Sequence, residues 1–419
     1  MTERLLQYIW QFQYFNTNEL LTIEEEPVQV IHPGTYNTNQ GPDFIDAKIK
    51  IGNTIWAGSI ELHINTSHWK NHKHTGDTNY KNVILHVVWQ HDIDLALPFS
   101  TIVLQDRISK FLLAKYNELL NAANFIPCEK TIHKVNALTW ISWKERLLIE
   151  RLQKKSHLVF DYLKKNNNHW EEIFWWLLAK NFGVKINSDA FEKIARSISI
   201  NILAKHKNQI HQLEALLFGQ AGLLENDFNE DYPALLQKEY RFLKNKYKLQ
   251  KAEAPLFFLR MRPANFPTLR LAQLAMLVHN SSHLFSSVKE TTSITAVQKL
   301  LNVTANDYWH YHYVFDELSG FKKKNLGAQM MNNLMINTII PVVFAYGVYH
   351  KEDQFKEKAL QWLAEIKAEK NNITRDFELL NIENKTAFDS QALLELRNEY
   401  CNKKRCLDCA IGNKLLKDR

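Results

Sequence analysis

Glycine and proline are scarce in this sequence, with 12 and 10 among 419 residues. Collagen-like, low-complexity and linker-dominated chains contain many more of both, so these classes are excluded. Disorder is also excluded, because 45% hydrophobic and 12% aromatic residues supply ample material for a large core. A chain of this length is too long for one ordinary domain, and we expect two or three folded units.

Long hydrophobic runs are missing as well. The longest apolar stretch extends from Leu334 to Gly347 and contains Asn337, Thr338 and Pro341. It is shorter than the roughly 20 residues that a membrane-spanning helix needs. The N-terminal segment carries charged residues and no small-residue cleavage site, so a secretory signal is not expected. The sequence predicts a cytoplasmic protein without a membrane span.

Two hydrophobic periodicities divide the chain. Period-two alternation between about residues 24 and 108 predicts strands near residues 28–31, 44–51, 54–64, 83–89 and 101–104. Gly52-Asn53 provides a two-residue turn, so the second and third strands should form an antiparallel hairpin. From about residue 112 the period becomes 3.6. The predicted fold class is α+β, with an N-terminal mixed sheet and flanking helices over residues 1–126 and a larger all-α domain over residues 127–419.

One stretch of the predicted hairpin carries side chains suited to metal chemistry. Asp43 opens the first strand, and Glu61 and His63 lie two positions apart on the next, so they share a face. The hairpin places Asp43 beside Glu61. Two converging carboxylates favour a hard divalent cation such as Mg²⁺ or Mn²⁺. Walker, dinucleotide-binding, nucleophile-elbow and kinase motifs are absent from the sequence.

This arrangement resembles the PD-(D/E)XK nuclease superfamily, in which a helix precedes a hairpin with Pro-Asp on one strand and Asp/Glu-x-Lys on the next. The resemblance implies a restriction-endonuclease-like sheet, in which Asp43 and Glu61 hold the metal and the Leu62 carbonyl can add a ligand. His63 would take the place of the lysine. Imidazole has an ordinary pKa near ~6.5, so His63 could act as a base or a ligand, or the site could be catalytically silent. The first helix offers no obvious acidic residue facing the core, which is a second departure.

Residues that follow the hairpin extend the candidate site. His68, Trp69, Asp77 and Tyr80 come shortly after Glu61 and are candidates for substrate contact. A different set, His63, His72, His74 and Asp77, contains ligands that zinc prefers. The sequence therefore leaves open a zinc-dependent hydrolase, alongside surface histidines on a polar loop.

The four cysteines form a second candidate metal site. Cys401, Cys406 and Cys409 form a C-x4-C-x2-C cluster, and Cys128 is the remaining cysteine of the chain. Four thiolates can hold Zn²⁺ or an iron–sulfur cluster. The division into one remote and three C-terminal cysteines is similar to the iron–sulfur staple of some helicase–nuclease members of the PD-(D/E)XK superfamily, although the spacing differs. The alternative is a set of reduced, partly buried thiols.

Basic residues offer candidate contacts for an anionic partner. The formal net charge is +7. In the segment RPANFPTLR, Arg262 and Arg270 could receive a phosphate near a helix start, although a buried hydrogen-bonded network is the simpler interpretation. Trp143, Lys144 and Arg146 could contact nucleic acid, although aromatic residues at helical spacing more often belong to a core.

Several segments together indicate a family. GPDF, the segment GSIELH, RPANFPTLR and the cysteine-rich end resemble an uncharacterised bacterial family known as a domain of unknown function, which implies the two-part layout and no activity. The functional hypothesis is a metal-dependent nuclease that acts on DNA or RNA. Its alternatives are a catalytically inactive nuclease-like module that binds nucleic acid or protein, and the zinc-dependent hydrolase.

Overall fold

The computed structural model describes residues 1–72, 74, 76–281 and 283–417. The chain forms two compact units. Unit 1 combines Met1–Trp143 with Leu396–Arg419, and unit 2 is Lys144–Glu395. This division differs from the predicted one, which placed the whole chain after residue 126 in the helical domain. The C-terminal segment belongs to unit 1 because its side chains enter that unit's core.

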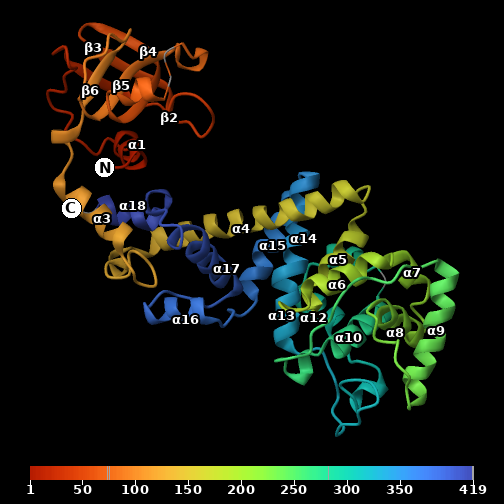
Figure 1. Ribbon diagram of the computed structural model, residues 1–419. Helices are drawn as coiled ribbons and strands as arrows, with labels where there is room; N and C mark the ends of the chain where they lie inside the picture. Colours follow the sequence, from red (N-terminus) through yellow and green to blue (C-terminus); the bar gives the residue numbers. More distant parts are fainter. Residues whose placement is uncertain (73, 75, 282, 418–419) are drawn as a thin grey trace. The chain divides into compact units, whose positions relative to one another are not determined.

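Unit 1 is built on a mixed sheet (Figure 1). The strand order is β1-β3-β4-β5-β6, with β2 paired to β3. The pairs β1–β3 and β3–β4 are antiparallel, and the pairs β4–β5 and β5–β6 are parallel. The predicted strands are confirmed to within about two residues at each end. The strands are β1 (Val28–His32), β2 (Thr35–Tyr36), β3 (Phe44–Ile51), β4 (Thr54–Asn65), β5 (Val83–Gln90) and β6 (Ser100–Val103).

The β3–β4 hairpin contains a bulge that determines which residues meet across it. Ile51 pairs with Thr54 across the predicted two-residue turn, in which Gly52 has φ +55°. The register shifts between Phe44 and Ala47, and Asp46, between them, has φ 58°. An extra residue in one strand changes its side-chain parity, so Phe44 and Ala47 are both buried despite their odd spacing. Phe44 therefore pairs with Ile60.

Helices and the C-terminal segment complete the core of unit 1. The helix α1 packs against β4 and buries Leu6, Ile9 and Trp10. Leu407 and Leu416 belong to the same apolar cluster as the sheet residues. The helices of unit 1 are α1 (Glu3–Gln11), α2 (His68–Asn71), η1 (Thr78–Tyr80), η2 (Gln105–Arg107), α3 (Lys110–Asn121), η3 (Ile132–Lys134), η7 (Leu396–Cys401), η8 (Cys406–Asp408) and α18 (Ala410–Lys417), with the first residues of α4 (Ala137–Lys165).

Unit 2 is helical and has its own large apolar cluster. Its most buried aromatic side chains include Phe174, Phe218, Trp309 and Trp362. Its elements are the remainder of α4, α5 (Trp170–Phe182), α6 (Ser188–Ser197), α7 (Ile200–Lys205), α8 (Ile210–Gln220), α9 (Asp231–Tyr247), η4 (Pro263–Asn265), α10 (Pro267–Asn280), α11 (Leu284–Glu290), α12 (Ile294–Leu301), η5 (Asp307–His310), α13 (Ala328–Leu334), η6 (Met335–Ile339), α14 (Ile340–His350), α15 (Asp353–Glu365), α16 (Asn372–Leu379) and α17 (Ala387–Glu395). The α+β fold class is thus confirmed.

One continuous helix in unit 2 is unusually long and apolar. Residues 328–350 form α13, a π-helical turn and α14, and this is the one helix in the described ranges whose length and composition would allow it to cross a membrane. Its most apolar window is 67% buried inside the protein. Lys155 donates to the Ile336 carbonyl at 3.3 Å and to Asn337 Oδ1 at 3.0 Å. These features are those of a core helix with a polar contact on one side.

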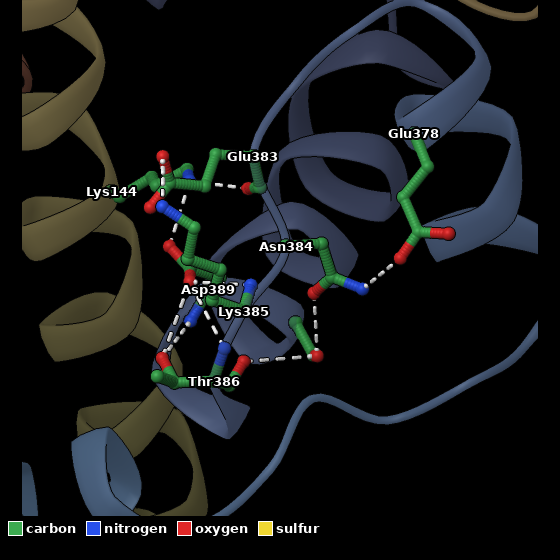
Figure 2. A network of polar contacts seen from close by, with 8 residues as sticks. Lys144, Glu378, Glu383, Asn384, Lys385, Thr386 and Asp389 are labelled. Carbon is green, nitrogen blue, oxygen red and sulfur yellow. Dashed lines mark hydrogen bonds and ion pairs between the residues drawn. The ribbon is translucent and has the colours of Figure 1, made fainter.

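An ion pair between the buried Lys144 of α4 and the partly buried Asp389 attaches α4 to α17 (Figure 2). Lys144 Nζ donates to Asp389 Oδ1 at 2.7 Å and to the Glu383 carbonyl at 2.6 Å. The second Asp389 oxygen accepts N–H groups of Lys385 and Thr386 at 3.0 and 3.1 Å. Lys144 is therefore buried, and its ammonium group is hydrogen-bonded within this network. The expected contact of Lys144 with nucleic acid is wrong, and Trp143 is buried as well.

The Lys144–Asp389 pair yields a stability prediction. Asp389→Asn should lower the free energy of unfolding by about 3 kcal/mol, because it leaves the Lys144 ammonium buried without a counter-charge. Adding Lys144→Met should restore part of that loss. Burial alone would raise the pKa of Asp389, but the Lys144 ammonium and nearby N–H donors lower it overall. The contribution of this carboxylate should be present above pH ~4 and be lost as the pH falls further.

Urea denaturation of the three proteins measures these differences, with Lys385→Met as an exposed control that should change stability by less than about 0.5 kcal/mol. Equal stabilities of the single Asp389 variant and the double variant would show that the pair is not coupled.

Candidate metal centre

Asp43 and Glu61 lie side by side and hold each other in place. The Asp43 backbone N–H donates to Glu61 Oε2 at 3.0 Å, and the Leu62 N–H donates to Asp43 Oδ2 at 3.1 Å. Gln7 of α1 donates to Asp43 Oδ1 at 2.7 Å. The predicted proximity of the two carboxylates is confirmed. It follows from the register, because Phe44 opposite Ile60 in an antiparallel pair puts Asp43 opposite Glu61.

The other Glu61 oxygen faces a group of imidazoles. Glu61 Oε1 lies 3.6 Å from His63 Nε2 and 3.5 Å from His74 Nε2. His63 Nε2 lies 3.1 Å from His72 Nδ1. Ligand atoms that share one tetrahedral ion at about 2.1 Å are separated by about 3.4 Å, and each of these three pairwise distances is near that value.

The three histidines lie within 4.8 Å of one another at their ligand nitrogens. Glu61 and His63 are only 6% and 1% exposed, whereas His72 is exposed. The site is therefore buried on the side of Glu61 and His63 and open to solvent at His72. His74 Nε2 is buried and has no hydrogen-bond partner. A metal ion would satisfy this nitrogen, and the donor set therefore fits a metal.

His86 of β5 supports His63 from behind. His63 Nδ1 lies 2.9 Å from His86 Nε2. When Nδ1 carries the proton and donates to His86, the His63 Nε2 lone pair is free on the side of Glu61 and His72, which is the tautomer a metal ligand needs. Burial and the neighbouring imidazoles lower the pKa of His63 to about 2 and that of His86 to about 3. Both rings are therefore neutral near pH 7.

Burial also perturbs the two carboxyl groups. It raises the pKa of both Asp43 and Glu61, and the nearby Asp43 charge raises the pKa of Glu61 further. The hydrogen bonds from Gln7 and Leu62 oppose the shift at Asp43. Without a metal, the pair therefore retains a proton on Glu61 near neutral pH. A divalent cation would replace that proton.

A second group of ligands adjoins the first. Glu3, His68 and His72 also bring their ligand atoms within 4.8 Å of one another. Glu3 lies on α1, so the first helix brings a carboxylate to the site, although from outside the core-facing side that the sequence-based expectation concerned. Glu3 and Gln7 were missed because helical periodicity identifies the face of α1 that packs on the sheet, whereas these residues reach the site from the helix edge.

The remaining predicted contact residues surround the histidines. Trp69 is buried and its ring centroid lies 5.2 Å from that of His74. Tyr80 stacks on His74 with centroids 3.9 Å apart. Asp77 Oδ1 accepts the Asn79 N–H at 2.9 Å and caps η1. The structure brings His68, Trp69 and Tyr80 to the site and gives Asp77 a turn-forming contact, while their roles toward a substrate stay predictions.

The four cysteines, which form the second candidate metal site, all lie in unit 1. Cys401, Cys406 and Cys409 are buried and Cys128 is half-buried. Burial, followed by the neighbouring thiols, raises the pKa of Cys128 and Cys409 to about 12. The Ile411 and Gly412 N–H groups at the start of α18 face Cys409. In the described ranges, no three cysteines place their sulfur atoms within 4.8 Å of one another.

Arg262 and Arg270 belong to unit 2, where they line a cavity. Arg270 donates to Gln273 Oε1 at 2.8 Å, so the hydrogen-bonded network expected for this helix face is present.

These features define a protein with a mixed-sheet unit that carries a histidine-rich candidate metal centre and a helical unit with a basic cavity. Residues 3–372 match the family model described as "Protein of unknown function (DUF2851)", and the chain belongs to this family. The matched residues contain the carboxylate pair, the histidines and Cys128, and end before Cys401. No curated protein and no solved structure matches the chain.

Manganese binding tests the candidate centre. The wild-type chain should bind Mn²⁺, and the affinity should increase by about tenfold per pH unit between pH 7 and 8, because binding displaces one proton from Glu61. Glu61→Gln should weaken binding and remove this pH dependence. His74→Asn should weaken binding by at least about tenfold, since it removes a ligand. Electron paramagnetic resonance measures the free Mn²⁺.

The control is His133→Asn, an exposed histidine of unit 1 that should leave the affinity unchanged. Equal affinities of the wild-type, Glu61 and His74 proteins would rule out this ligand set.

Proposed function

We propose that the chain is a metal-dependent hydrolase of phosphodiester bonds in nucleic acid. The observation that carries the proposal is the position of Glu61, whose one oxygen is held by the Asp43 N–H while the other faces His63 and His74 Nε2. Glu61, His63, His72 and His74 would hold the ion. Imidazole-rich sites suit zinc, iron and related metals better than Mg²⁺, and Mn²⁺ accepts both ligand types.

The chemistry follows from these groups. A bound divalent ion would supply an acidified water and polarise a phosphate oxygen. Asp43 would position Glu61 through two hydrogen bonds. Its backbone N–H donates to the Glu61 carboxylate, and its own carboxylate accepts the N–H of the next residue, Leu62. His86 would orient His63. The adjoining Glu3, His68 and His72 group could hold a second ion or orient the phosphate.

Nucleic acid as the substrate rests on the resemblance of the hairpin to the PD-(D/E)XK superfamily. Pro42-Asp43 precedes β3, and Glu61-x-His63 lies on β4, as in that pattern with His in place of Lys. The net charge of +7 is compatible with a polyanionic substrate.

The neutral His63 favours a second candidate function. A lysine would bring a fixed positive charge to the phosphate, whereas burial lowers the pKa of His63 to about 2. A nuclease-like module that binds nucleic acid without turnover would have the same fold and an uncharged residue here. Salt-dependent binding without cleavage would identify it.

For the cysteines, we propose an iron–sulfur cluster. Sulfur atoms around one zinc ion at about 2.3 Å lie about 3.8 Å apart, which is closer than any three of these cysteines approach. A cluster places several iron and sulfide atoms between the thiolates and suits wider spacing.

Cleavage assays test the proposed hydrolase. With Mn²⁺, the protein should cleave single- or double-stranded DNA or RNA, and Glu61→Gln should reduce the rate at least about 100-fold, as expected for the loss of a metal ligand. Asp43→Asn should reduce it by about 10- to 100-fold through Glu61. Glu24→Gln, an exposed carboxylate of unit 1, is the control. Cleavage that survives both site substitutions would come from a contaminant or from another site.

Anaerobic purification tests the cysteines. The protein should contain iron and acid-labile sulfide, and Cys409→Ser should reduce both, because all the thiols are needed to hold the cluster. The variant should still bind Mn²⁺ at the histidines, which shows that unit 1 remains folded. Stoichiometric zinc, or protein free of iron after anaerobic purification, would contradict this assignment.

A further inference from the structure

A cavity of about 480 Å³ in unit 2 has an unusually basic lining. Its charged side chains all carry positive charge, and no aspartate or glutamate lines it in the described part of the chain. The cationic residues are Arg262, Arg270, Lys322, Lys323 and Lys324. Five amide side chains, among them Asn265 and Gln273, provide further hydrogen-bond donors. A cavity with this lining has a positive potential that only anions relieve.

Two of these cations are buried without a counter-charge. Arg270 is 7% exposed and Lys324 is 4% exposed. Arg270 donates to Gln273 Oε1 and to Asn265 Oδ1, and its Nε has no partner. Lys324 Nζ has no hydrogen-bond partner and lies 3.3 Å from the centre of the Tyr313 ring.

Neither Arg270 nor Lys324 forms an ion pair with any described residue. Buried cations are normally paired, because removing an unpaired charge from water costs several kcal/mol. The protein maintains this arrangement at a cost that an anion in the cavity would offset.

The fold holds the cations in position. Arg270 and Gln273 lie one turn apart on α10. Gln273 Nε2 donates to the carbonyls of Lys324 and Asn325 at 3.3 and 3.2 Å, and the Ala305 N–H donates to the Lys324 carbonyl at 3.1 Å. The network around Arg270 therefore connects the RPANFPTLR segment to the lysine run. It fixes the geometry of a binding site in addition to stabilising the helix.

We propose that this cavity binds a small ligand with at least two phosphate groups, of the pyrophosphate or nucleoside diphosphate class. Balancing five positive charges requires several negative charges close together, and a ligand with two phosphate groups carries them. Guanidinium and amide donors match phosphate oxygens. The cavity volume is within the ~300–1,000 Å³ that small-molecule sites occupy. A nucleic-acid strand on the surface would rely on exposed cations, whereas Arg270 and Lys324 are buried. The proposal is independent of the metal centre in unit 1.

Calorimetric titration tests the cavity. The full-length protein, freed of divalent metal with a chelator, is titrated with pyrophosphate, with a nucleoside diphosphate and with orthophosphate. Pyrophosphate or the nucleoside diphosphate should bind at about one equivalent, and orthophosphate should bind more weakly. Arg270→Gln should weaken binding by about tenfold or more, because it removes a charged donor. Comparison of the two ligands shows whether a nucleoside is needed.

Further variants separate the cavity from general charge effects. Lys322→Gln with Lys323→Gln changes two exposed side chains and should weaken binding while the protein stays folded. Arg241→Gln removes an exposed charge of α9 and should leave the affinity unchanged.

Three results would overturn the proposal: no binding of either ligand, an equal loss in Arg241→Gln, or binding of a single-stranded oligonucleotide that depends on Arg270 without binding of pyrophosphate.

Discussion

The reciprocal contact between Asp43 and Glu61 is the constraint on which the candidate centre depends. The Asp43 N–H donates to the Glu61 carboxylate. In return, the N–H of Leu62, the neighbour of Glu61, donates to the Asp43 carboxylate. Both side chains are thereby held in a buried position where free carboxylates are costly. The contact exists because the bulge at Asp46 shifts the register so that Phe44 faces the core and Asp43 lies opposite Glu61.

The electrostatics around Glu61 explain why a metal suits the site. The Glu61 carboxyl group, which keeps its proton when no metal is bound, faces imidazoles that are neutral, because burial lowers the pKa of His63 and His74. Neutral imidazoles do not compensate a negative charge, but they are ready to bind a cation without losing a proton. The cavity in unit 2 presents the opposite charge, because its buried cations have no anionic partner and would be stabilised by a bound anion. A buried carboxyl group that retains a proton marks the candidate site in unit 1, and buried cations without a counter-charge mark the cavity in unit 2.

Much of the sheet could be predicted from the sequence, because period-two alternation and the Gly52-Asn53 turn are local signals. The hairpin brings Asp43 near Glu61, but it is the bulge at Asp46, which no local pattern reveals, that puts the two residues opposite each other. The approach of His72 to His63 and of His74 to Glu61 depended on a polar segment, whose path the alternation of apolar and polar residues does not encode. Glu3 and Gln7 reach the site through the packing of α1. Lys324 joins Arg270 through contacts between distant segments, and the burial of Lys144 depends on Asp389. The C-terminal segment enters unit 1 because Leu407 and Leu416 complete its core, which no local pattern reveals.

The central claim is that Glu61, His63, His72 and His74 bind one divalent ion. Anomalous X-ray scattering from crystals grown with Mn²⁺ tests it most directly, because it locates the ion without assuming its ligands. The account predicts a peak about 2.1 Å from Glu61 Oε1 and from the facing imidazole nitrogens. A fully occupied ion bound elsewhere, with these side chains still hydrogen-bonded to one another, would contradict it.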